Sequence, residues 1–197
     1  MSQMMIIEGV LTSDQGGRPH VAMMGPRVNR ELTEWILRPY PTSTTYRLLR
    51  QEPRCTFHVI DDALLISHIV CKLPCDVEWE QRDGHWVLRD ACRWFALEVV
   101  ECREGTPAEV SCRLVGQGEL RPFWGWNRAA HAVLEGAILC SRLHLLGPDV
   151  VWTELNRLQP LVDKTGGDRE HLAWQHLCRL VEQWQPSGPP HQPCAGT

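Results

Sequence analysis

The hydrophobic pattern of the chain changes its period once, near Trp124, and this change limits the folds open to it. Before that point apolar residues come in short runs separated by Gly, Pro and Asp turns, which is typical of strands. After it, the apolar residues of 127–146 recur at helical spacing. We therefore expect a β domain at residues 1–125, a helical segment packed on it at residues 126–185, and a disordered tail, rich in Pro and Gly, at residues 186–197.

The β part offers seven or eight strand candidates, most of them joined by hairpin turns. Asp83-Gly84 between two apolar runs is the strongest hairpin signal. A short helix is predicted over Thr44–Gln51, and the run 94–101 alternates imperfectly, which indicates a strand covered on both faces for part of its length. Hairpin connections favour an antiparallel barrel over a parallel sheet, so the predicted fold class is a β-barrel with helices, that is α+β. The strand candidates are residues 5–11, 18–28, 33–38, 55–60, 77–80, 85–88, 92–103 and 109–119.

Charge and cysteine content limit which partners the protein can bind and in which cellular compartment we expect it. The 197 residues carry 20 basic and 24 acidic side chains, and a net charge of -4 argues against nucleic acid as a partner. Residues 1–60 are the exception, with seven Arg and five acidic residues. No apolar run reaches the roughly 20 residues that cross a membrane. Nine cysteines, an odd number, and no secretory signal predict a cytoplasmic protein with reduced thiols and no metal site.

The densest candidate site is the segment from Arg38 to Arg47. It contains four consecutive hydroxyl residues, Thr42, Ser43, Thr44 and Thr45, at the start of the predicted short helix. The free N–H groups of a helix N-terminus, with hydroxyls and arginines beside them, would bind a phosphate dianion. The alternative is a helix cap whose spare hydroxyls face water.

A second candidate is the end of the run His20–Pro26. There Met24 and Gly25 would expose backbone groups to a flat ligand, and Met would add a soft apolar surface. A β-bulge or a strand bend is the structural alternative.

Residues suited to acid–base or nucleophilic catalysis do not form a recognised motif. His58 followed by Asp61 and Asp62 favours a buried strand histidine and a helix-capping pair of aspartates over a catalytic base with two carboxylates. Catalytic residues therefore stay unassigned from the sequence.

Several segments, in this order, carry a family resemblance. They are Ile6–Leu11, Arg18–Pro26, Leu37–Arg47, Phe57–Asp62, and the helical pair Asn127–Glu135 and Ser141–Leu143. Together they resemble an uncharacterised prokaryotic family of FMN-binding split-barrel proteins, distantly similar to flavin reductases and pyridoxamine-phosphate oxidases.

The resemblance implies a six-stranded, Greek-key-like split barrel that forms a homodimer and binds FMN between subunits. On this chain, Arg38 and the loop Thr42-Ser43-Thr44-Thr45 would hold the FMN phosphate, and Met24-Gly25 would lie against the isoalloxazine. Asn127 and Arg128 would approach the flavin from the helical segment.

Two functions follow from these observations. The first is a flavin-dependent oxidoreductase or flavin carrier, in which the cofactor supplies the chemistry and the protein supplies orientation. The second is a non-catalytic dimeric binding module for another phosphorylated or planar cofactor, with a possible link to one-carbon metabolism.

Overall fold

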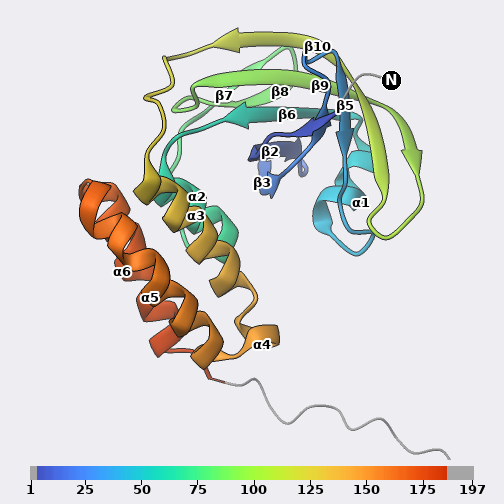
Figure 1. Cartoon of the computed structure of the whole chain (residues 1–197). Coiled ribbons are helices and arrows are strands. Elements are labelled where there is room, and N and C mark those ends of the chain that lie inside the picture. Colours follow the sequence, from blue (N-terminus) through green and yellow to red (C-terminus); the bar gives the residue numbers. More distant parts are fainter. Residues whose placement is uncertain (1–3, 186–197) are drawn as a thin grey trace, which may run out of the picture. The chain divides into compact units, whose positions relative to one another are not determined.

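The computed structural model describes residues 4–185, and these fall into two compact units that divide between Trp126 and Asn127. The first unit contains ten strands and two helices. The strands are β1 (Met5–Ile6), β2 (Gly9–Asp14), β3 (Pro19–Met24), β4 (Arg27–Val28), β5 (Glu34–Leu37), β6 (Arg54–Val59), β7 (Trp79–Arg82), β8 (His85–Leu88), β9 (Arg93–Arg103) and β10 (Glu109–Glu119), and the helices are α1 (Thr44–Gln51) and α2 (Ala63–Cys71). Figure 1 shows the strands curling around a common interior.

Eight of the strands form one antiparallel sheet in the order β1-β4-β5-β10-β9-β6-β2-β3. The two edges of this sheet belong to one long hairpin. One arm of the hairpin contains β1 and β2, the other contains β3 and β4, and β1 pairs with β4 while β2 pairs with β3. The backbone N–H of Ile7 donates to the carbonyl of Pro26 at the point where the hairpin bends (3.3 Å). If each bent arm is counted as one strand, six strands form a closed ring, which is the predicted split barrel.

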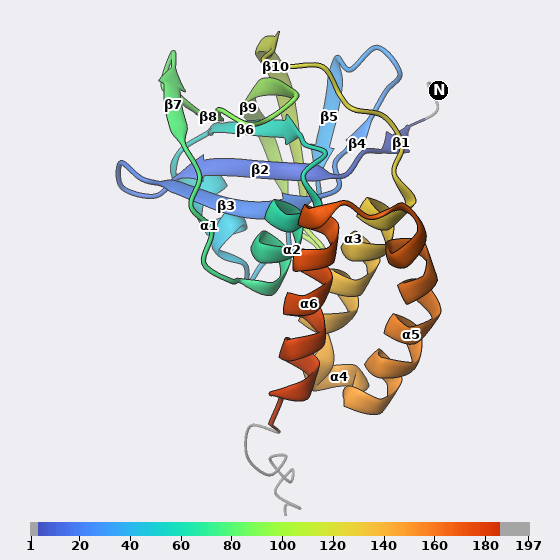
Figure 2. The same cartoon turned by 90° about the vertical axis from the view of Figure 1, so that its left-hand side faces the viewer.

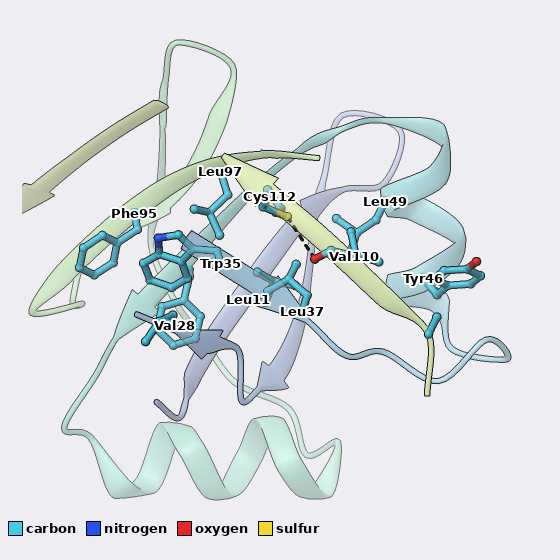
Figure 3. Packing of buried hydrophobic residues seen from close by; sticks show 13 residues of the cluster. Leu11, Val28, Trp35, Leu37, Tyr46, Leu49, Phe95, Leu97, Val110 and Cys112 are labelled. Carbon is cyan, nitrogen blue, oxygen red and sulfur yellow. Dashed lines mark hydrogen bonds between the residues drawn. The ribbon is translucent and has the colours of Figure 1, made fainter. Parts of the chain in front are cut away.

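The barrel interior holds one hydrophobic core with aromatic rings at its centre. Trp35 lies 5.0 Å from Phe95 and 5.4 Å from Phe57 between ring centroids, and all three side chains are buried. Helix α1 contributes Tyr46 and Leu49 to the same core (Figure 3). The polar ends of α1 are therefore fixed relative to the barrel wall by a packed apolar face.

The outer face of β2, β6 and β9 is covered by a second layer. The hairpin β7–β8 packs there, and Asp83 and Gly84 at its turn both have positive φ, as the Asp-Gly signal predicts for a type I′ turn. Ala96, on the outer face of β9, is buried between its neighbours Phe95 and Leu97, which confirms that β9 is covered on both faces over this stretch. Figure 2 shows β7 and β8 beside β6.

The aspartate pair after β6 has two roles rather than one. Asp62 caps α2 by accepting from the backbone N–H groups of Leu64 and Leu65, as predicted. Asp61 does not cap the helix, and that part of the interpretation is wrong. Its carboxylate pairs with Arg121 (2.5 and 3.1 Å) and accepts from the N–H of Trp124 (2.9 Å), because the chain returns here 60 residues later.

The Asp61–Arg121 pair gives a stability prediction. The Asp61 side chain is 9% exposed; burial would raise the pKa of its carboxyl, but the hydrogen bonds and charge of Arg121 and the Trp124 N–H bring the pKa below its usual value. Arg121→Ala leaves that carboxylate without its cation, so we expect a loss of about 2 to 3 kcal/mol in the free energy of unfolding by urea.

Arg89→Ala is the matched control for Arg121→Ala. Arg89 pairs with Glu78 at 2.8 Å, but both side chains are more than half exposed. An exposed pair contributes about 0 to 1 kcal/mol, so the control variant should unfold close to the wild type. Equal losses of unfolding free energy in the two variants would contradict the argument that the burial of Asp61 makes its ion pair important.

The second unit is helical: α3 (Arg128–Ser141), α4 (Leu143–Leu146), α5 (Pro148–Thr165) and α6 (Asp168–Glu182). The predicted helical segment is therefore found, and Pro148 occupies the first turn of α5, where a proline costs no hydrogen bond. Gly136 of α3 lies close to Trp174, Leu155 and Leu177, where the three longer helices meet. The predicted tail 186–197 lies outside the described residues.

Within residues 4–185, no helix is both long enough and apolar enough to cross a membrane.

Candidate functional site

The N-terminus of α1 is built by the hydroxyl loop that the sequence singled out. Ser43 is the N-cap: its Oγ accepts from the N–H of Tyr46 (3.2 Å), and its own N–H donates to Tyr40 O (2.9 Å). The N–H groups of Thr44 and Thr45 have no partner among the described residues. The cap alternative is therefore correct for Ser43, while two backbone donors stay open for an anion.

A surface depression of about 510 Å³ begins at this N-terminus and continues along α1. Ser43, Arg47 and Arg50 line it at helical spacing, so they share one face of the helix. No carboxylate of the described residues lies in its lining. The full lining is Pro41, Thr42, Ser43, Thr44, Tyr46, Arg47, Arg50 and Gln51.

Arg47 and Arg50 form no ion pair with any described residue. Arg50 instead stacks on the ring of Tyr46, with its Cζ 5.8 Å from the ring centroid. A lining of hydroxyls and two arginines without a carboxylate gives the depression a positive potential. Its chemistry suits a phosphate or another anion.

Arg38 directly follows β5, at the start of the loop that leads to α1. Its Nε is buried and has no hydrogen-bond partner, which is unusual for a charged donor. The next residue, Pro39, accepts from the N–H of Ala108 (3.0 Å) and thereby ties the loop to the β9–β10 connection. Arg38 is not part of the lining of the depression, so the structure brings together Thr42, Ser43 and Thr44 but does not join Arg38 to them there.

Thr45 is buried and, unlike Thr42, Ser43 and Thr44, does not line the depression. Its Oγ1 is 3.1 Å from Nε2 of His20 on β3. Burial lowers the pKa of His20, and the charge of Arg47 lowers it further. Thr45 therefore connects the helix N-terminus to a half-buried histidine whose pKa is lowered.

Met24 and Gly25 lie at the bend of the closing hairpin, between β3 and β4. Met24 ends β3 and packs against the barrel core, so its side chain is partly used inside the protein. A Cβ on Gly25 would lie 3.0 Å from Ile6 Cγ2, which shows how closely the two arms approach. A flavin contact from these residues stays a prediction.

Asn127 and Arg128 begin the helical unit. Asn127 caps α3: its Oδ1 accepts from Ala129 N (2.7 Å) and Ala130 N (3.2 Å), and its Nδ2 donates to Thr165 O (3.2 Å). This capping already uses its side-chain amide. Arg128 is exposed. Their predicted contact with the flavin also stays a prediction.

Sequence reasoning missed two contributors to the site. Arg50 was available from the sequence, because residues 43, 47 and 50 share a helix face. His20 was not, because 25 residues separate it from Thr45 and only the barrel brings β3 beside α1.

Known structures share this fold. An FMN-bound protein from Methanosarcina mazei matches with a TM-score of 0.75 at 21% identity, over 89% of this chain and 94% of the other. The styrene monooxygenase flavin reductase from Pseudomonas putida S12 matches with a TM-score of 0.51 at 14% identity, over 58% and 80%. Flavoredoxin from Methanosarcina acetivorans matches with a TM-score of 0.51 at 10% identity, over 60% and 74%.

No curated protein matches the chain. Two family profiles do: the N-terminal domain of the "protein of unknown function (DUF447)" over residues 7–121, and the second DUF447 profile over residues 127–179. They correspond to the β unit and to most of the helical unit. The chain, a split barrel followed by helices, therefore belongs to the DUF447 family.

Proposed function

We propose that this protein is an FMN-binding flavoprotein that acts as an oxidoreductase. The observation that carries the proposal is the arginine-lined, carboxylate-free depression at the N-terminus of α1. The FMN-bound family member from Methanosarcina mazei, which matches over nearly its whole length, supports FMN as the ligand.

The residues present suit the FMN phosphate. Two unpartnered backbone N–H groups, the hydroxyls of Thr42 and Thr44, and the guanidinium of Arg47 would hold its oxygens. The buried Nε of Arg38 is a charged donor that still lacks an acceptor, as a residue awaiting an anion would be.

FMN, when bound, supplies hydride or electron transfer, which amino-acid side chains do not provide. The chain's own part is to bind the phosphate, to orient the ring and to exclude water. The depression contains no carboxylate or histidine in its lining, so we assign no acid or base there. Met24, Gly25, Asn127 and Arg128 stay proposed ring contacts.

We further propose a homodimer. Large apolar side chains remain exposed on the first unit, above all Trp124 at 90% and Trp126 at 87%. Exposed aromatic patches of this kind mark interaction surfaces. Light scattering after size exclusion would give the mass directly, and a monomer at micromolar concentration would contradict this part.

The phosphate site gives a binding prediction. Arg47→Ala, and separately Thr42→Val with Thr44→Val, should each weaken FMN binding about tenfold or more, because a hydrogen bond to a charged group contributes about 1.5 to 3 kcal/mol. Both variants leave the Ser43 cap intact. Quenching of FMN fluorescence measures the affinity.

Riboflavin, which lacks the phosphate, should bind all of these proteins equally. Arg113→Ala is the matched control, since Arg113 is an exposed barrel arginine paired with Glu98. Wild-type affinity in the Arg47 variant would place the phosphate elsewhere, and no FMN binding at all would refute the flavoprotein. FMN that binds but is not reduced by NADH or NADPH would argue for a carrier or binding module instead.

A further inference from the structure

His20 on β3 contacts Thr45, the residue that follows Thr44 of the proposed phosphate site. Its Nε2 lies 3.1 Å from Thr45 Oγ1, and Thr45 is the second residue of α1. Thr45 is buried and His20 half-buried, so the contact is shielded from bulk water. Among the described residues, Arg47 is the charge that acts on His20, and Arg47 also lines the depression.

We propose that His20 is a positioning residue of the phosphate site, which holds the Thr45 hydroxyl in place and takes up one proton from solvent when a phosphate dianion binds at the N-terminus of α1. The inference rests on the proposed function. It assigns a role to a residue outside the lining of the depression.

The chemistry follows from the donors and acceptors of the pair. A neutral imidazole with an unprotonated Nε2 accepts the Thr45 hydroxyl proton. Once His20 is protonated, Nε2–H must donate to Thr45 Oγ1, which leaves the hydroxyl proton free for another acceptor.

In the free protein, burial and the charge of Arg47 together lower the pKa of His20, which favours the neutral imidazole. A bound dianion offsets the charge of Arg47 and attracts the imidazolium, so both effects favour the protonated form. By linkage, protonation of His20 must then strengthen anion binding by the same factor.

NMR titration of the His20 imidazole tests the inference without any activity assay. We expect the pKa of His20 to rise by about one unit when FMN is added, equivalent to a tenfold coupling. Riboflavin should leave it unchanged. If FMN binds and the titration of His20 does not move, this inference is overturned and FMN binding stands; if FMN does not bind, the proposed function itself fails.

Two substitutions separate proton uptake from a structural role. His20→Gln keeps a hydrogen bond to Thr45 but cannot titrate, so wild type should bind FMN about threefold more tightly than H20Q at pH 6 and equally at pH 8. The FMN phosphate also titrates in this range, but it affects both proteins equally, so its effect drops out of the ratio of the two affinities. A ratio that is constant across this range would overturn proton uptake.

If H20Q does not fold, the pH dependence of FMN binding can be compared between Thr45→Val and Thr45→Ser instead. The serine keeps the hydroxyl and should retain the full pH dependence. The valine keeps only the charge interaction between the phosphate and His20, so its pH dependence should be smaller. Equal pH profiles in the two variants would also overturn the proposal.

Discussion

Replacing His58 with alanine is expected to lower the free energy of unfolding by about 4 kcal/mol, measured by urea denaturation at pH 7.5. His58 is 0% exposed and joins three strands: its Nδ1 donates to Val10 O (3.1 Å), and its Nε2 accepts from Leu88 N (3.1 Å). Truncation leaves a cavity and two unpaired backbone groups between β2, β6 and β8. His144→Ala, at an exposed position, should stay within about 0.5 kcal/mol of wild type.

The same histidine makes stability depend on pH. Burial lowers the pKa of His58 to about 4, whereas an unfolded histidine titrates near 6.5. Between these values the unfolded chain binds more protons, so stability falls as the pH drops through this range, by about 3 kcal/mol in full. His58→Leu cannot titrate, and its stability difference from wild type should shrink as the pH falls from 7 to 4.5. A constant difference would contradict the buried neutral histidine.

Replacing Gly9 with alanine is expected to cost at least about 3 kcal/mol. A Cβ at this position would lie 2.3 Å from the carbonyl oxygen of His58 and 2.6 Å from Phe57 Cζ. The first of these atoms is backbone in the neighbouring strand β6, so relief requires β2 and β6 to separate. Thermal unfolding followed by circular dichroism measures the loss.

Gly116 is the matched control for Gly9, because it is also a glycine in a strand of the barrel. A Cβ there meets its nearest atom, Ala96 Cβ, at 3.6 Å, an ordinary contact. Gly116→Ala should therefore be neutral or slightly stabilising, since alanine loses less backbone entropy in a strand. A similar loss in both variants would mean that strand flexibility, not the contact with β6, sets the effect.

Features that depend on neighbours in the sequence were predictable. The bounds of α1 follow from the hydroxyl cap and the helical spacing, and the β7–β8 hairpin follows from Asp83-Gly84. The phosphate candidate was visible for the same reason, because its hydroxyls and Arg47 lie within one turn and one loop. Local propensity and periodicity carry this information.

Contacts between residues that lie far apart in the sequence were not predictable. Asp61 looks like a helix cap in the sequence, yet its partner Arg121 is 60 residues away. His20 meets Thr45 only because the barrel closes. Met24-Gly25 left two interpretations open, since a bend and a ligand contact require the same small, extended residues. Pairings between distant residues leave no local signal.

The bent hairpin also determines how the chain must fold. Residues 5–28 and the β9–β10 pair form from neighbouring segments, but the ring closes only through three long-range pairings, β2 with β6, β6 with β9, and β5 with β10. There Val10 pairs with His58, and Leu37 with Val110. Such high contact order places barrel folding on the scale of milliseconds to seconds. We expect ring closure to be the slow step, so the anion site of α1, whose buried face belongs to the closed core, would assemble last.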